Sequence, residues 1–115
     1  MNELVKGYSV DVQFPDVSGI EHHYMLFIRD EIAEIEDQLS DTDLRVLQEA
    51  DTRLMRDAAL FIPELSRFID LAVEREKKKI SPDRWWHYLD VIAIANQATL
   101  GRKSTTYSAP RYNSV

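Results

Sequence analysis

Hydrophobic residues recur at helical spacing across the middle of the chain, from residue 40 to residue 80. Intervals of three, four and seven residues are typical of one buried helical face. A straight helix of about 40 residues would be about 60 Å long, whereas a compact domain of this size has a radius of gyration of about 13 Å. Pro63 disfavours a helix interior, so we expect one long helix kinked at Pro63. The apolar stripe comprises Leu44, Leu47, Leu54, Ala58, Phe61, Ile62, Leu65, Ile69, Ala72 and Val73.

One carboxylate, Asp51, falls inside this apolar stripe. It is compatible with a local helix break, in which Asp51 or Thr52 caps a second helix. It is equally compatible with a half-buried carboxylate paired with an arginine, or with a functional acid. The sequence leaves these three interpretations open.

A shorter amphipathic helix is predicted before the long one, from about residue 19 to residue 39. Ser18 and Glu21 have the spacing of a capping box at its start. We expect this first helix to pack antiparallel against the first half of the long helix, because the connection between them is short. Its predicted buried face comprises Tyr24, Ile28, Ile32, Ile35 and Leu39, with Met25 at the edge.

The last predicted helix runs from Pro82 to about Thr99, after the start signal of Ser81 and before a C-cap at Gly101. It is apolar on two opposite sides, which indicates burial on both sides. Three helices rarely surround a fourth in so small a chain, so we expect the second side to contact another protein. The first side comprises Trp85, Leu89, Ile92, Ala93 and Leu100, and the second His87, Val91, Ile94 and Ala98. The adjacent Trp85 and Trp86 side chains diverge, so one of them should be partly exposed or meet a partner.

The first seventeen residues follow a different pattern, in which apolar and polar residues alternate. Period-two alternation predicts a half-buried β-strand. We expect an extended arm packed on the helices, a small hairpin, or a strand that pairs with a second chain. The alternating apolar positions are Tyr8, Val10, Val12 and Phe14.

These patterns predict an all-α fold. We expect a small antiparallel bundle of three to four helices over residues 18–101, preceded by the strand or arm of residues 1–17. Residues 102–115 are rich in serine and threonine and lack periodicity, so they are predicted to form a flexible tail or to dock on the acidic first helix of the same or a neighbouring chain.

Composition restricts the possible partners and compartments. The 115 residues carry a net charge of −6, and residues 19–40 alone contain six acids and one base. An acidic body disfavours nucleic-acid binding and suits a basic protein partner. The sequence has no cysteine, no apolar run long enough for a bilayer and no signal peptide, so we expect a cytoplasmic protein that does not bind membranes.

Candidate chemistry is sparse. The residues available to a metal-dependent helical-bundle enzyme are His22, His23, His87 and Asp51. They lack the spacings of helical zinc or di-iron sites, and no phosphate-binding glycine loop or nucleophile motif occurs. We therefore expect neither a cofactor nor an enzymatic activity.

The leading functional hypothesis is a non-enzymatic protein–protein interaction module, a homo-oligomer with a dimer favoured or an assembly subunit. The alternatives are an acidic regulatory binder of a basic protein, of the antitoxin or immunity kind, and the small metal-dependent enzyme. The predicted interface comprises Trp85, Trp86, His87, Val91, Ile94 and Ala98, with Tyr8, Val10 and Val12 of the strand.

Overall fold

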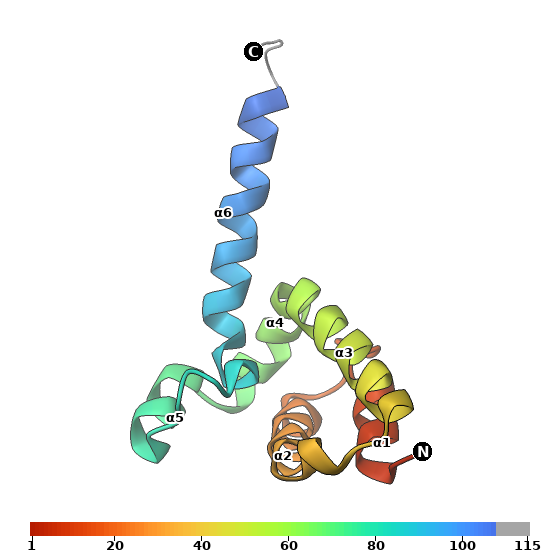
Figure 1. The fold of residues 1–115 in the computed structure, drawn as a ribbon. Helices are drawn as coiled ribbons and strands as arrows, with labels where there is room; N and C mark the ends of the chain where they lie inside the picture. The colour runs from red at the N-terminus through yellow and green to blue at the C-terminus, as the bar shows by residue number, and fades with distance from the viewer. Residues whose placement is uncertain (108–115) are drawn as a thin grey trace.

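The protein is helical throughout the part that the structure describes (Figure 1). The computed structural model describes the backbone of residues 1–107 and the side chains of residues 1–99. The all-α class is confirmed, but the predicted three to four helices are six α-helices and two short 3-10 helices within residues 1–107. Their bounds are α1 Glu3–Asp11, α2 Gly19–Ile35, η1 Glu36–Gln38, α3 Asp41–Arg56, α4 Ala58–Phe68, α5 Leu71–Lys78, η2 Trp85–Tyr88 and α6 Leu89–Tyr107.

The N-terminal segment is a helix, so the prediction of a strand or extended arm was wrong. The Asn2 side chain caps α1 by accepting hydrogen bonds from the backbone N–H groups of the second and third helical residues. Val5, Tyr8 and Val12 lie at intervals of three and four, and all three are buried in the core. Tyr8 and Val12 are two of the four alternating apolar positions. The other two, Val10 and Phe14, are exposed.

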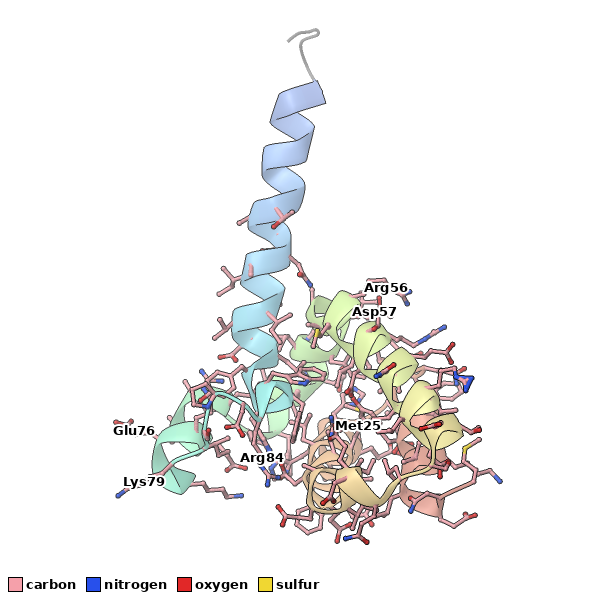
Figure 2. All side chains as sticks on the ribbon, in the orientation of Figure 1. Met25, Arg56, Asp57, Glu76, Lys79 and Arg84 are labelled. Atoms are coloured by element: carbon pink, nitrogen blue, oxygen red, sulfur yellow. The ribbon has the colours of Figure 1, made fainter. Side chains whose placement is uncertain are left out.

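The long central helix is divided into α3, α4 and α5, and the predicted kink at Pro63 is not where the chain bends. Pro63 lies inside α4, whereas the helix is interrupted at Asp57 and again at Ile69 and Asp70. Figure 2 labels Asp57 at the turn between α3 and α4. Asp70 caps α5 by accepting a hydrogen bond from Val73 N–H at 3.2 Å, whereas the Asp57 side chain makes no capping bond and pairs with Arg56.

Helix α1 occupies the place beside α3 where α2 was expected to pack. It lies against both α2 and α3, while α2 packs mainly on α4, and α4 also contacts α6. The prediction that the first helix would pack along the first half of the long helix was therefore wrong. At the crossing of α2 and α4 the backbones approach closely, because a Cβ added at Gly19 would overlap the carbonyl oxygen of Glu64.

The buried face of α2 also differs from the prediction. Met25 and Leu26 are buried, whereas Tyr24 is exposed. The buried face includes His22 and Arg29, two polar residues outside the predicted apolar face. His22 Nε2 forms a 2.9 Å hydrogen bond with the carbonyl of Pro15, which compensates for its burial. The core contains Val5, Tyr8, Val12, Met25, Leu26, Ile32, Leu47, Ala50, Leu54, Ala58, Phe61, Leu65, Leu71, Trp86, Leu89 and Ala93.

The last helix begins later and ends later than predicted. Ser81 lies in the loop before η2, and α6 continues through Gly101 to Tyr107, so the predicted C-cap was wrong. The side chain of Leu100 and residues 108–115 of the expected tail lie outside the described residues. Figure 1 shows α6 projecting away from the other helices, and the radius of gyration is accordingly 16.5 Å. None of the helices in the described part of the chain is long and apolar enough to cross a bilayer.

Candidate functional site

Four of the predicted interface residues belong to the interior of a single chain. Tyr8 and Val12 of α1 and Trp86 and His87 of η2 are all buried by other parts of the chain. Their assignment to an interface was therefore wrong. Trp86 and His87 are buried because both hydrogen-bond to Asp30 of α2, a contact that the sequence pattern does not reveal.

The remaining predicted interface residues are accessible. Val91 and Ile94 of α6 are 50% and 68% exposed, and Ala98 on the same helix is exposed as well. Val10 is exposed on α1, far along the chain from the others. Trp85, the first residue of η2, is half-buried. The structure thus retains one accessible apolar stripe on α6, which we define as Val91, Ile94 and Ala98.

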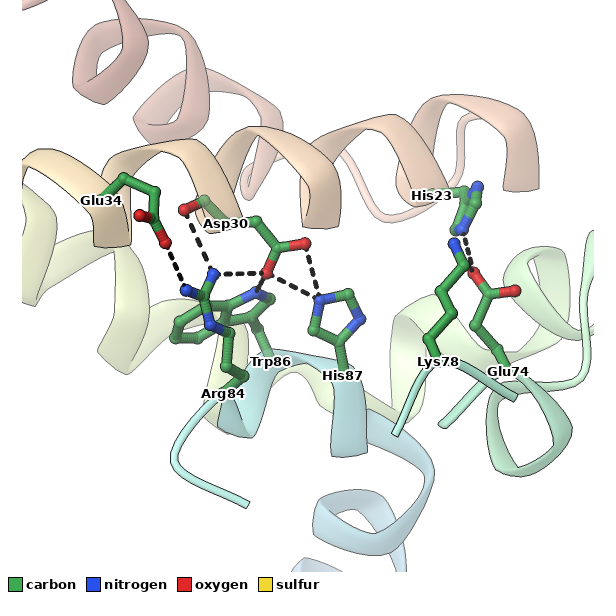
Figure 3. Close-up of polar contacts among 8 residues, drawn as sticks. All are labelled: His23, Asp30, Glu34, Glu74, Lys78, Arg84, Trp86 and His87. Atoms are coloured by element: carbon green, nitrogen blue, oxygen red, sulfur yellow. Dashed lines mark hydrogen bonds and ion pairs between the residues drawn. The ribbon is translucent and has the colours of Figure 1, made fainter. Parts of the chain in front are cut away.

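Asp30 is the centre of a polar network that fixes η2 against α2 (Figure 3). Its carboxylate accepts hydrogen bonds from Trp86 Nε1 at 2.8 Å and from His87 Nε2 at 2.8 Å. Arg84 Nη1 contacts the same oxygen at 3.2 Å. Burial tends to raise the pKa of Asp30, but the hydrogen bonds from His87 and Trp86 outweigh it and hold that pKa below its ordinary value. The network explains how two adjacent aromatic side chains both turn inward.

A second polar contact joins α2 to α5. Glu74 accepts a 2.7 Å hydrogen bond from His23 Nε2 and a 3.1 Å bond from Lys78 Nζ (Figure 3). Burial tends to raise the pKa of Glu74, but the bonds from His23 and Lys78 lower it below its ordinary value. Together with Asp30, these residues line a groove of about 470 Å³ between α2, α5 and η2. Asp30 and Glu74 are already paired, so they attach α2 to η2 and to α5.

A third polar cluster lies in the core and settles the interpretation of Asp51. Arg29 donates from Nε and Nη2 to the two carboxylate oxygens of Asp51, each at 3.0 Å. Tyr8 donates from its hydroxyl to Asp51 at 2.6 Å. The prediction of a carboxylate paired with an arginine is confirmed, and the helix break at this position was wrong because α3 continues past it to Arg56.

An acidic cleft of about 810 Å³ lies between the end of α2, η1 and η2. Two arginines line it, and each is engaged with carboxylates: Arg84 contacts Glu34 at 2.6 Å, and Arg29 contacts Glu36 at 3.4 Å. Among the described residues, Asp37 makes no ion pair. The lining residues that define this acidic cleft are Arg29, Ala33, Glu34, Glu36, Asp37, Leu44, Asp51, Asp83, Arg84, Trp85 and Trp86.

The structure does not assemble the candidate metal ligands. His22, His23 and His87 bond to different partners, respectively the Pro15 carbonyl, Glu74 and Asp30, and Asp51 binds Arg29. Within the described part of the chain, no group of three or more histidine, aspartate or glutamate side chains is placed to bind a metal ion. The metal-dependent alternative therefore gains no support from the geometry.

The acidic cleft and Asp30 were missed by sequence reasoning. Glu34 and Asp37 are exposed, and helical spacing alone gives no indication that a cleft forms beside them. The available signal was the density of acids in residues 30–37, which contain five. Comparison of the chain with protein-family models, with curated proteins and with solved structures gave no match.

Proposed function

We propose that this protein is a protein–protein interaction module that self-associates through the apolar stripe of α6, with a dimer as the favoured assembly. The observation that carries the proposal is the exposure of Val91 and Ile94 on a helix that leaves the body. Contiguous exposed apolar surface, in contrast to single scattered residues, marks interaction sites in proteins.

One side of α6 is covered by the rest of the chain, and the opposite side is exposed. Leu89 and Ala93 are buried, and α6 packs on α4. Asn96 extends this attachment by donating from Nδ2 to the backbone carbonyl of Met55 at 2.9 Å. At 100° per residue these positions lie opposite the stripe of Val91, Ile94 and Ala98. The stripe therefore faces away from the chain's own core.

The chemistry of the stripe suits a second copy of the same helix. Residues 91–101 contain no charged side chain, so two copies meet here without electrostatic repulsion. The small side chain of Ala98 allows close approach of another helix, since the distance between packed helices depends on the side chains at the contact. A self-complementary patch of this kind is what a two-fold dimer interface requires. Figure 2 shows the outer part of α6 standing clear of the other helices.

The test is a polar double substitution, Val91→Ser with Ile94→Ser, measured by multi-angle light scattering and sedimentation equilibrium at micromolar concentration. We expect more than one chain per particle for the unaltered protein and a monomer for the variant. Val10→Ser, which removes an exposed apolar side chain on α1, is the matched control and should leave the assembly intact. A monomeric unaltered protein would contradict the proposal.

The acidic cleft favours a second candidate function, an acidic regulatory binder of a basic protein. Five carboxylates line the cleft against two arginines. Association of such a surface with a cationic partner weakens as ionic strength increases, because salt screens charges over about 8 Å at physiological concentration. Recovery of one tightly bound basic protein at low salt, and its release at high salt, is the expected outcome. Retention of that protein at high salt would count against the acidic surface as its binding site.

A further inference from the structure

The acidic cleft combines an excess of carboxylates with a buried, unpartnered donor on one of its lining residues. The carboxylates of Glu34, Glu36 and Asp37 lie on one side, and the two arginines in the lining already have carboxylate partners. The remaining negative charge favours a cationic group. A cation alone would not complete the site, however, because the lining also contains an unused hydrogen-bond donor.

That donor belongs to Arg29, whose side chain is only 4% exposed. Its Nη1 atom is buried and has no hydrogen-bond partner among the residues that the structure describes. A buried donor without an acceptor is unfavourable, so an occupant that also brings carbonyl or hydroxyl oxygens, directly or through a water, suits this lining. The required ligand therefore combines positive charge with oxygen acceptors, as a basic and hydroxyl-rich peptide does.

Trp85 supplies a third element of recognition. It lines the cleft and is half-buried, so part of its indole remains accessible. Indole faces attract guanidinium and ammonium groups, and arginine is the most frequent partner. Trp86 already illustrates this preference inside the protein, since the Arg29 guanidinium lies 4.2 Å from its ring centroid.

The C-terminal segment of the chain has the matching chemistry. Residues 102–115 contain three basic residues and no acidic residue. Half of the segment consists of serine, threonine and tyrosine, so hydroxyl acceptors are abundant. Its basic residues are Arg102, Lys103 and Arg111, and its hydroxyl residues are Ser104, Thr105, Thr106, Tyr107, Ser108, Tyr112 and Ser114.

The length of α6 prevents this segment from reaching the cleft of its own chain. The cleft residues Trp85 and Trp86 belong to η2, which directly precedes Leu89, where α6 begins. The helix then extends for 19 residues, which is about 28 Å at 1.5 Å per residue. From its end at Tyr107, the four residues to Arg111 span about 14 Å when fully extended. Arg111 thus falls well short of the cleft beside the start of its own helix.

We propose that residues 102–115 of one copy occupy the acidic cleft of a second copy. The inference rests on the proposed self-association and names a second contact within it, polar and charged, in addition to the apolar stripe of α6. The basic residues lie beside Glu34 and Asp37, an arginine or lysine contacts Trp85, and an oxygen of the segment accepts from Arg29 Nη1. A C-terminal segment that projects from each copy and binds the next one links the copies through opposite charges.

A charge exchange tests this contact in the full chain. The tail variant R102E/K103E/R111E reverses the three basic charges of residues 102–115, and the cleft variant E34K/D37K reverses two exposed acids. We expect the dissociation constant for self-association of each variant to rise about tenfold or more, because like charges then face each other. An equimolar mixture should recover the unaltered affinity, since each tail then meets a complementary cleft. Sedimentation velocity supplies the measurement, and circular dichroism verifies that each variant is folded.

The outcomes separate this inference from the proposed function. If R102E/K103E/R111E associates as tightly as the unaltered protein while Val91→Ser with Ile94→Ser becomes monomeric, the tail contact is refuted and the α6 stripe remains. If the tail variant dissociates while the α6 variant does not, the tail contact stands and the stripe is refuted. If the cleft variant E34K/D37K does not fold, the dissociation constant of R102E/K103E/R111E alone tests the tail contact.

A direct titration identifies the occupant. A synthetic peptide of residues 102–115 is added to the full-length R102E/K103E/R111E protein, whose own tail no longer competes. We expect a saturable change in tryptophan fluorescence that weakens with added salt and is lost in Trp85→Phe, which retains Trp86. A peptide of the same composition in scrambled order should bind at least about tenfold more weakly. Equal binding of the scrambled peptide would overturn the assignment and indicate a general site for basic proteins.

Discussion

The Tyr8 hydroxyl donates a 2.6 Å hydrogen bond to Asp51, which lies 43 residues further along the chain. Arg29 binds the same carboxylate through two nitrogens, each at 3.0 Å. One residue of this cluster comes from each of the first three α-helices, so the cluster joins α1, α2 and α3 inside the core. A buried ion pair depends on such additional hydrogen bonds to compensate for its desolvation.

Tyr8→Phe should therefore destabilise the fold without altering its shape. The substitution removes one hydrogen bond to a charged acceptor, which is worth about 1.5–3 kcal/mol. The free energy of unfolding, measured by urea denaturation, should decrease by about that amount. Tyr24→Phe is the matched control, because Tyr24 is exposed on α2 and its change should stay within about 0.5 kcal/mol. Equal effects of the two substitutions would contradict the role assigned to Tyr8.

Ionisation of Tyr8 provides an independent test of the same cluster. Burial raises the pKa of Tyr8 first of all, and the negative charge of Asp51 raises it further. An ultraviolet titration should therefore leave Tyr8 protonated near pH 10, where exposed tyrosines ionise. More tyrosines should titrate when the protein is unfolded in urea, and Tyr8→Phe should reduce that difference by one. Ionisation of all tyrosines together in the folded protein would contradict the burial of this hydroxyl.

Asp30 should determine part of the loss of stability in acid. Its pKa in the folded state lies below the ordinary value of about 3.9, so its contribution is complete above about pH 4 and is lost as pH falls through the folded-state pKa. Asp30→Asn should lower stability at neutral pH and flatten the decline below pH 4. Chemical denaturation at a series of pH values supplies the measurement. Glu31→Gln, on an exposed neighbour, should leave the pH profile unchanged.

Gly19 and Gly7 should respond in opposite directions to alanine. At Gly19 a Cβ would overlap the Glu64 carbonyl oxygen and lie 2.8 Å from Phe68 Cβ, so Gly19→Ala forces α2 and α4 apart. Such overpacking costs about 1–3 kcal/mol. At Gly7, inside α1, a Cβ meets nothing within 4 Å, so Gly7→Ala should stabilise the helix by about 0.5–1 kcal/mol. Thermal denaturation of the two variants supplies the measurement, and a stabilising Gly19→Ala would refute the close approach.

Lys79 occupies a left-handed backbone conformation, with φ of 53° and ψ of 51°, at the end of α5. Glycine adopts this conformation without steric cost, so Lys79→Gly should increase the free energy of unfolding by about 1 kcal/mol. The control is Lys77→Gly inside α5, which should lower it by about 0.5–1 kcal/mol. The pair isolates backbone geometry, because both substitutions remove the same exposed charge. Equal destabilisation of the two variants would contradict the left-handed backbone conformation of Lys79.

The sequence predicted the features that depend on local chemistry. Ser18 caps α2 and Ser40 caps α3, where the expected start signals lie. The all-α class followed from helical spacing, and the pairing of Asp51 with an arginine was one of the three interpretations that the cost of burying a charge left open. These inferences required no knowledge of which helices meet.

The errors arose where a distant contact determines the structure. The inward turn of Trp86 and His87 depends on Asp30, which precedes Trp86 by 56 residues. The N-terminal residues satisfied both a period-two and a helical pattern, and only the burial of Val5 and Tyr8 in the common core distinguishes them. The long helix ended at aspartates, a residue type that serves equally well on a helix surface. Local pattern alone does not resolve such cases, because packing overrides it.

The projection of α6 affects how the size of the protein is judged in solution. The molecule measures 49 × 34 × 26 Å along its principal axes, so it experiences more friction than a sphere of equal mass. A single chain will elute early from a gel-filtration column calibrated with globular standards and will tumble anisotropically. Elution volume by itself would therefore make a solitary molecule resemble a dimer, and a scattering or equilibrium mass is needed to count the chains.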